Sequence, residues 1–305
     1  MNRSVLAGLI LSRMVLGAGQ DTSADSYSFT TVDVPGATNT NATGINNRGQ
    51  IVGFYHDASG DHGFVLSSDR RTFTTIDNPA GIGVTSLQGI NDDGYVIGVF
   101  TNPITNFTQS FLADVSGSAF VNFGDPSVSA GSYGTYAHGI NDRGQIVGHF
   151  FGGGSDLHGF LRNADGTFVN FDDPNAPVGT IGTLGTVGRG INDIGQIVGY
   201  FPGLNGTGDF AFLRSSDGSA YTDVTVPNSQ DTVAAGINNR GEIVGYFDTA
   251  SAGFVRSSKG IFTFFHDPDA TEGIYPQGIN DRGQIVGYFV NASGYHGFVA
   301  TPTTP

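Results

Sequence analysis

The sequence has 305 residues and a formal net charge of −14, with only 13 Lys and Arg residues. This balance offers no basic stripe that could neutralise phosphates, which argues against nucleic acid and anionic membrane surfaces as partners. The chain contains no cysteine, which excludes disulfides, zinc–thiolate sites and cysteine nucleophiles. Its 48 glycines are spread at regular intervals, a distribution that indicates many tight turns in an ordered chain.

The first 24 residues resemble a bacterial secretory signal peptide. Arg3 gives a positive start, and the apolar run Val5–Leu11 follows it. We therefore expect a secreted, extracellular protein whose residues 25–305 form one domain; a short disordered or packed N-terminus is the alternative interpretation. No other apolar run approaches the length of a membrane-spanning helix, so we expect no membrane insertion.

The rest of the chain repeats one unit of four short β-like runs. A run such as FTTVDVP, which begins at Phe29, comes first, and a run that begins with Gly-Ile-Asn comes second. A run such as QIVGYF is third, and one such as HGFVL is fourth. Val, Ile, Phe, Tyr and Thr fill these runs, whereas Gly, Asn, Asp and Pro bound them, which is typical of strands joined by turns. The Gly-Ile-Asn triplets begin at Gly44, Gly89, Gly139, Gly190, Gly236 and Gly278.

Four strands in about 45 residues, repeated throughout the chain, predict an all-β, six-bladed β-propeller. A β-solenoid is the competing architecture, but its coils are usually shorter. The chain starts with a first-run strand and ends with a fourth-run strand, so the last blade lacks its outer strand. We expect the segment Tyr27–Val34 to supply that strand beside Gly278–Phe298 and to close the ring, since a closed ring leaves no open edge.

The segment Ile-Asn-Asp-Arg-Gly-Gln has the chemistry of a type I turn, with Asn at the first position and Gly at the fourth. It therefore predicts a hairpin between the two innermost strands, in which the Asn side chain bonds backbone amides beyond it. The alternative is a divalent cation, but a calcium loop needs several carboxylates at alternating positions. The residue after the Asn is acidic in only some copies: Asp92, Asp142, Asp193 and Asp281, against Asn47 and Asn239. We favour the turn and expect no metal and no cofactor.

The phrase GIN[DN]xGQIVGY followed by His-Gly-Phe resembles a bacterial extracellular repeat family that is named for its His-Ala-Phe signature. His-Gly-Phe stands at His62, His158 and His296 and is lost in the other three units. The resemblance covers the chain after about Tyr27, and it implies secretion and a repeat fold but no agreed chemistry. Because these histidines recur, we expect them to pack or to form hydrogen bonds; a metal held by the loop His56–His62, or by His149 with His158, is the alternative.

Function is better sought where the units differ, in the long and dissimilar loops after the Pro and after QIVGYF. The meander places these loops on one face of the ring. The residues just before each Gly-Ile-Asn also differ, and we expect them to surround the mouth of the central channel: Thr43, Gln88, His138, Arg189, Ala235 and Gln277. With Tyr133, Tyr136, Tyr275 and Glu272, they would form a polar, aromatic rim suited to carbohydrate. Alternatively, they are solvated strand starts without a function.

These features favour a monomeric binding or interaction module that recognises polysaccharide or a cell-surface partner. One alternative is a polysaccharide- or lactone-directed hydrolase or lyase that uses His138, Arg189 and Glu272 at the channel mouth. In that case Glu272 could pair with Asp173 or Asp231 as two catalytic carboxylates. A purely structural surface protein is the remaining alternative.

Overall fold

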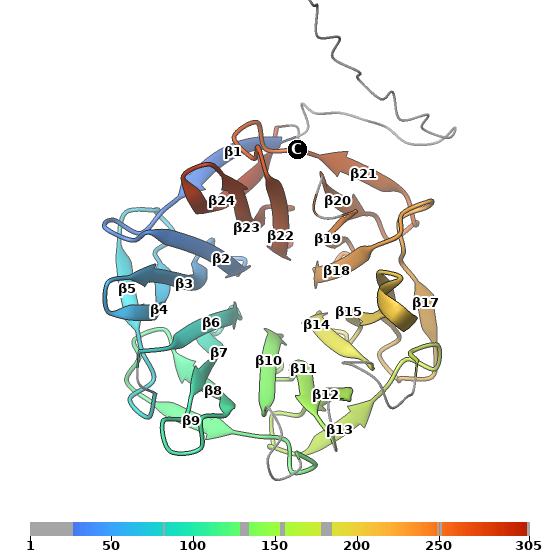
Figure 1. The fold of residues 1–305 in the computed structure, drawn as a ribbon, viewed down its shortest axis with the longest axis horizontal. Coiled ribbons are helices and arrows are strands. Elements are labelled where there is room, and N and C mark those ends of the chain that lie inside the picture. The colour runs from blue at the N-terminus through green and yellow to red at the C-terminus, as the bar shows by residue number, and fades with distance from the viewer. Residues whose placement is uncertain are drawn as a thin grey trace, which may run out of the picture.

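The computed structural model describes residues 27–81, 83–128, 134–152, 156–177, 185–248, 250 and 252–303. They form six four-stranded antiparallel sheets, arranged as blades around a central axis (Figure 1). The chain is therefore a six-bladed β-propeller, as the repeats predict. The expected signal peptide lies outside the described residues. Within them, no helix is long and apolar enough to cross a membrane.

In every blade the Gly-Ile-Asn run is the innermost strand, and the QIVGYF and HGF runs follow it outward. Blades 1 to 3 consist of β2 (Asn39–Ile45), β3 (Ile51–Asp57), β4 (Gly60–Leu66) and β5 (Phe73–Ile76); β6 (Thr85–Ile90), β7 (Tyr95–Thr101), β8 (Thr108–Asp114) and β9 (Phe120–Phe123); and β10 (Thr135–Ile140), β11 (Ile146–Phe151), β12 (Leu157–Arg162) and β13 (Phe168–Phe171).

Blades 4 to 6 repeat this order around the other half of the ring, with a short 3-10 helix, η1 (Leu204–Gly206), between the second and third strands of blade 4. Their strands are β14 (Val187–Ile191), β15 (Ile197–Pro202), β16 (Asp209–Arg214) and β17 (Tyr221–Asp223); β18 (Thr232–Ile237), β19 (Ile243–Phe247), β20 (Ala252–Arg256) and β21 (Phe262–Phe265); and β22 (Gly273–Ile279), β23 (Ile285–Asn291), β24 (Gly294–Pro302) and β1 (Tyr27–Val32).

The ring is closed by its first strand. β1 pairs antiparallel with β24, in a register that runs from Tyr27 opposite Pro302 to Val32 opposite Gly297. In Figure 1 the blue first strand lies beside the red last strands in one blade. The predicted closure is confirmed: the N-terminal segment is the outer strand of the last blade, so both ends of the described chain are held in one sheet.

The core between blades is built from the constant phenylalanine of the fourth run. Its ring packs on the constant glycine of the neighbouring strand. A Cβ added to Gly148 would lie 2.8 Å from the ring of Phe160 and 2.0 Å from the carbonyl oxygen of Tyr136. Burial of such a ring contributes about 2–3 kcal/mol. The equivalent side chains, all at most 1% exposed, are Phe64, Phe111, Phe160, Phe212, Phe254 and Phe298.

The recurring histidines form hydrogen bonds, as predicted. Each donates from Nδ1 to a carboxylate just beyond the end of the outermost strand. The distances are 2.7 Å from His62 to Asp77, 2.9 Å from His158 to Asp172 and 2.8 Å from His296 to Asp33. The bond ties the third strand of each of these blades to the segment that follows the fourth.

Candidate functional site

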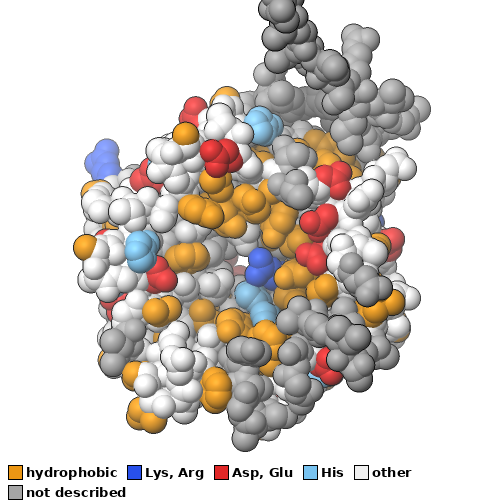
Figure 2. All heavy atoms as spheres, in the orientation of Figure 1, with side chains coloured by type: hydrophobic (Ala, Val, Ile, Leu, Met, Phe, Trp, Pro, Cys, Tyr) orange, Lys and Arg blue, Asp and Glu red, His pale blue; other side chains and the backbone are white. Residues whose placement is uncertain are grey.

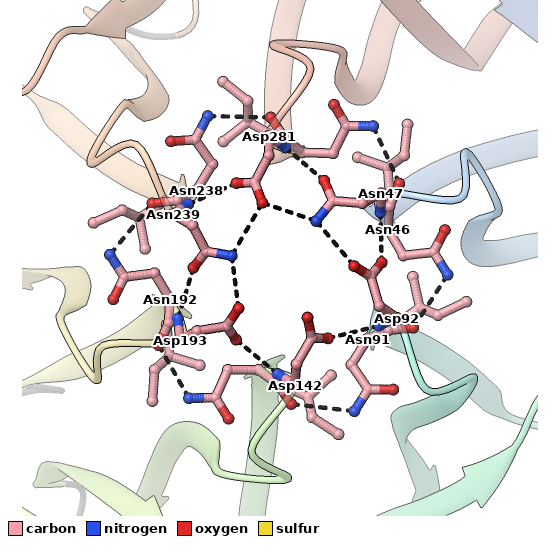
Figure 3. A pocket seen from close by; sticks show the side chains of 18 residues that line it. Asn46, Asn47, Asn91, Asp92, Asp142, Asn192, Asp193, Asn238, Asn239 and Asp281 are labelled. Atoms are coloured by element: carbon pink, nitrogen blue, oxygen red, sulfur yellow. Dashed lines mark hydrogen bonds between the residues drawn. The ribbon is translucent and has the colours of Figure 1, made fainter.

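One end of the central channel is formed by the six Asn-x-x-Gly turns (Figure 3). In each, the glycine amide donates to the carbonyl of the Asn, for example from Gly144 to Asn141 at 3.1 Å. The glycine has a positive φ, +72° at Gly144, which a residue with a Cβ rarely adopts. The asparagine Oδ1 then accepts the amide of Gln145 at 2.9 Å. These contacts confirm the predicted turn chemistry.

The same asparagines also join the blades in a closed cycle. Each side chain donates from Nδ2 to the backbone carbonyl of the corresponding Asn in the next blade, at 3.0 to 3.3 Å. Each is at most 4% exposed, so removing one would leave a buried carbonyl without its donor. The members of the cycle, in order, are Asn46, Asn91, Asn141, Asn192, Asn238 and Asn280.

A second cycle lies at the mouth of this end and uses the residue after each Asn. Its backbone amide donates to the side-chain oxygen of the equivalent residue one blade on, at 2.7 to 2.9 Å. Four members are Asp and two are Asn. Among the described residues, no group of three or more acidic or histidine side chains is placed to hold a metal ion. The members are Asn47, Asp92, Asp142, Asp193, Asn239 and Asp281.

The two Asn members separate some of the acidic charges but not all of them. Asn47 donates from Nδ2 to the carboxylates of Asp92 and Asp281, at 3.0 and 2.8 Å. Asp142 instead stands between two other aspartates. Desolvation, together with the charges of Asp193 and Asp92, raises the pKa of Asp142 to about 6.

The glycine of Gly-Ile-Asn lets the innermost strands converge. A Cβ added to Gly139 would lie 2.6 Å from the carbonyl oxygen of Arg189 and 3.2 Å from the Cα of Gly190. The isoleucines that follow line the channel between its two ends. In the repeated triplet, Gly therefore lets neighbouring inner strands approach closely, Ile fills the middle of the channel and Asn links adjacent blades. These structural roles explain why the triplet recurs in every blade.

At the variable end of the channel, a β-bulge in each innermost strand orients one side chain. The register shifts by one residue at the same place in each blade, for example between Ala137 and Gly139. A bulge leaves one residue unpaired and turns its side chain out of the ladder. The unpaired residues are the six that the sequence places at the channel: Thr43, Gln88, His138, Arg189, Ala235 and Gln277.

These six side chains meet around the axis, as predicted. The space that they enclose is about 20 Å³, which holds about one water molecule. The channel is thus constricted at this level, and a larger ligand has to bind above it, on the variable face. Figure 2 shows a basic side chain and a histidine at the bottom of the central hollow of this face, bordered by side chains of the hydrophobic class, which includes tyrosine.

Arg189 begins a hydrogen-bond chain at the constriction. Its Nη1 lies 3.2 Å from Nδ1 of His138, and His138 Nε2 lies 3.0 Å from Nδ1 of His149. A guanidinium has only donors, so His138 Nδ1 has to accept and its proton is on Nε2. His138 then donates to His149, whose proton is therefore also on Nε2. The geometry fixes both tautomers as long as both rings are neutral.

Burial and the guanidinium keep these two rings neutral. Desolvation and the charge of Arg189 hold the pKa of His138 well below its usual value. The same two causes lower the pKa of His149 to about 3. Arg189 itself also donates from Nη2 to Oε1 of Gln277 at 3.4 Å. Among the described residues, no carboxylate lies within ion-pair distance of its guanidinium.

Aromatic rings stand on both sides of Arg189. On blade 3, Tyr136 stacks on His149 with ring centroids 4.9 Å apart. On blade 6, Tyr275 stacks on Tyr288 at 4.7 Å, and Tyr246 of blade 5 meets Tyr275 edge-on at 5.1 Å. Desolvation raises the pKa of Tyr246 to about 12, so its hydroxyl remains a hydrogen-bond donor.

Two carboxylates on blades 4 and 5 complete the surroundings. The Asp209 amide donates to Oδ1 of Asp231 at 3.1 Å. Burial and the charge of Asp231 raise the pKa of Asp209 to about 6, and the charge of Arg189 opposes this shift. Near neutral pH Asp209 is therefore ionised, and its charge moderates the positive field of Arg189.

The other rim residues predicted from the sequence lie in different places. Tyr136 and Tyr275 lie beside the six residues that surround the channel axis, whereas Tyr133 lies outside the described residues. Glu272 is exposed before β22, where its amide donates to the carbonyl of Val290 at 2.9 Å. Glu272 lines none of the described cavities, and its proposed partner Asp173 lines a separate groove between blades 3 and 4.

Sequence reasoning missed the residues that follow the constant glycine of QIVG. Strand pairing places Tyr288 opposite Tyr275 and His149 opposite Tyr136, so these positions add a second layer to the variable mouth. The signal was available, because this position differs among blades while its neighbours do not. Its members are Phe54, Val99, His149, Tyr200, Tyr246 and Tyr288.

No protein-family model and no curated protein matches the chain. Solved structures do. A streptogramin B lyase has a TM-score of 0.50 at 15% identity, over 91% of this chain and 99% of that one. A gluconolactonase from Xanthomonas campestris has 0.53 at 12%, over 94% and 98%. The β-propeller domain of the trilobed protease from Pyrococcus furiosus, described as having an open velcro topology, has 0.52 at 8%, over 88% and 97%. At these identities the chain is similar to them in its propeller fold.

Proposed function

We propose that this protein is a secreted binding module that recognises a carbohydrate bearing a carboxylate through its variable face. The observation that carries the proposal is Arg189, a guanidinium at the bottom of an aromatic hollow with no ion-pair partner among the described residues. A partly buried cation is costly unless it is paired, and a guanidinium matches a carboxylate with two parallel hydrogen bonds.

The side chains around Arg189 favour a sugar as the molecule that carries the carboxylate. Tyr136 and Tyr275 offer ring faces for the apolar side of a pyranose, while tyrosine hydroxyls and Gln277 offer polar contacts. Secretion is part of the proposal and is supported by the apolar segment near the N-terminus.

A polysaccharide- or lactone-directed hydrolase or lyase is the second candidate, since an imidazole hydrogen-bonded beside a guanidinium is a possible base near a bound carboxylate. The lowered pKa values argue against it. An efficient general base has a pKa near the working pH, whereas that of His149 is about 3 and that of His138 is also depressed. The neutral histidines serve better to orient Arg189 than to remove a proton.

The test compares two forms of one polymer, polygalacturonate and its methyl ester, which differ only in the free carboxylate. Binding to the chain from Tyr27 onward is measured by titration calorimetry, with the release of soluble fragments followed in parallel. We expect binding of the free acid, at least tenfold weaker binding of the ester, and no fragments. Arg189→Ala should lose the preference for the acid, whereas Arg143→Ala, at an exposed arginine on the opposite face, should keep it.

Equal affinity for the two polymers, or an Arg189→Ala variant that keeps the preference, would contradict the carboxylate role. Release of fragments would instead make the protein an enzyme. No binding of either polymer, or of other acidic polysaccharides in the same assay, would favour the structural alternative.

A further inference from the structure

Two hairpins on the variable face each assemble a Ser, a His and an Asp. In blade 6, Ser293 Oγ lies 2.8 Å from His296 Nε2, and His296 Nδ1 lies 2.8 Å from Asp33 Oδ2. In blade 1, Ser59 stands 2.8 Å from His62, which stands 2.7 Å from Asp77. This order of contacts is that of a serine nucleophile, its base and the group that orients the base.

The two copies differ in what else accepts the serine hydroxyl. Ser59 Oγ donates to the carboxylate of Asp57 at 2.6 Å, and Asp57 also lies 3.5 Å from His62 Nε2. The bond to Asp77 raises the pKa of His62, which favours the charged imidazolium. The Ser59 hydroxyl is thus held by a carboxylate as well as by the imidazole, so the blade 1 copy is a structural hydrogen-bond network.

In blade 6, the position of Asp57 is taken by a neutral residue. Ser293 Oγ lies 2.6 Å from Oδ1 of Asn291, and that oxygen also accepts the Ser293 amide at 2.9 Å. An amide oxygen is a weaker acceptor than a carboxylate, because charge roughly doubles the strength of such a bond. Nδ1 of His296 keeps its proton and donates a hydrogen bond to Asp33. The lone pair on Nε2 can therefore accept the proton of Ser293.

The blade 6 copy also borders a groove, about 610 Å³ in volume, between blades 5 and 6. Ser293 is exposed at its edge, and His296 packs on the ring of Phe289 with centroids 5.2 Å apart. Pro268 and Phe289 give the groove an apolar wall, while Thr31 and Thr271 give it hydroxyl groups.

We propose that Ser293, His296 and Asp33 form an acyl-transfer site for esters of short-chain carboxylic acids. Ser293 Oγ attacks the ester carbon, and its proton moves to His296 Nε2. The bond from that carbon to the alcohol oxygen then breaks, and the leaving alcohol takes the proton from His296. Water hydrolyses the acyl-serine by the same two proton transfers. Asp33 is a positioning residue, and the hydroxyls of Thr31 and Thr271 can donate to the carbonyl oxygen.

The experiment exposes the purified chain to a fluorophosphonate, which reacts covalently with activated serine, and identifies the modified peptide by mass spectrometry. We expect modification at Ser293, with a rate at least tenfold lower in Ser293→Ala and His296→Ala. The matched control Ser59→Ala should react at the unchanged rate. Asp33→Asn should slow the reaction, and Asp33→Glu should restore part of the rate, because a carboxylate at this position orients the imidazole through Nδ1.

No modification of the folded wild type, or equal modification of Ser59 and Ser293, would overturn the proposal. A Ser293→Ala variant that reacts like the wild type would do the same. Thermal unfolding of each variant separates loss of reactivity from loss of fold. The readout is covalent labelling of Ser293 and not polymer binding, so failure here is distinguishable from failure of carbohydrate binding.

Discussion

The two ends of the central channel are built by adjacent residues of the same strands, yet they follow opposite rules. At the Asn turns, each blade contributes the same asparagine, and each of these side chains bonds the next blade. At the variable mouth, the residue before the same glycine differs from blade to blade, and one guanidinium lacks an ion pair within the described residues. Where all six blades carry the same residue, its polar groups bond one another around the ring. Where the blades differ, polar groups remain that can bond a ligand.

This difference assigns stability and recognition to residues that are close together in the sequence. Substitutions at the constant end should therefore change unfolding and leave binding alone, and substitutions at the variable end should do the reverse. Four changes, from the largest expected effect on stability to the smallest, can break or sharpen that contrast.

The largest effect is expected from Gly139→Ala, where the new Cβ would stand 2.6 Å from the carbonyl oxygen of Arg189. Backbone cannot move aside in a closed ring, so we expect a loss of about 2–3 kcal/mol in the free energy of unfolding. Gly278→Ala is the matched control, because its nearest backbone atom would be 3.3 Å away. Urea unfolding followed by circular dichroism measures both; similar losses would contradict the contact argument.

The next effect is expected from Asn141→Ala, which opens the asparagine cycle. It removes the donor to the Asn192 carbonyl, which is buried, and the acceptor for the Gln145 amide, which is partly buried. We expect a loss of about 2 kcal/mol. Asn170→Ala removes one exposed bond to Ser127 and should cost little. If the two variants unfold at the same urea concentration, the cycle contributes nothing to stability.

A smaller effect of opposite sign is expected from Asp142→Asn. The pKa of Asp142 is raised to about 6, so its ionisation in the folded protein costs stability as the pH rises from about 4 through 6. The variant should gain somewhat less than about 1 kcal/mol at pH 7.5 and nothing near pH 4, since the carboxyl is partly exposed. Asp281→Asn is the counterpart and should destabilise, because Asn47 and Asn239 both donate to that carboxylate. Melting temperatures across this pH range decide the sign.

The smallest effect on stability is expected from Arg189→Ala. Among the described residues, the guanidinium makes long hydrogen bonds, of 3.2 and 3.4 Å, to His138 and Gln277. The free energy of unfolding should change by less than about 0.5 kcal/mol, even though the preference for a carboxylated polymer is lost. A strongly destabilised variant would make Arg189 part of the scaffold and would weaken the division between the two ends.

The sequence was sufficient for the strand order, the closing strand and the type I turns because these depend on local patterns. Gly at the fourth turn position and the constant Phe of the fourth run report on their own strand. The period of the repeat also placed His138 and Arg189 at one level of the channel, since equivalent positions in a closed ring stand at equal height.

Contacts between repeat units could not be predicted from the sequence. The repeat shows that Asn141 recurs, but only the spacing of the inner strands reveals that its Nδ2 reaches Asn192 in the next blade. Likewise, nothing in the spacing of Ser293 and His296 distinguishes a turn from a hydrogen-bonded pair oriented by Asp33, which is remote in sequence. Glu272 is placed at the channel mouth because it lies in a loop of the variable face, and membership of such a loop carries no information about distance from the axis.

The pairing of β1 with β24 also orders events during synthesis. The segment Tyr27–Val32 leaves the ribosome before any blade exists, and its partner Gly297–Pro302 is made after all of the other strands. Five blades can assemble as they emerge, but the sixth stays one strand short until β24 has been made. The ring is therefore completed in a single late step, and an unfinished chain displays a vacant strand edge that a chaperone can recognise.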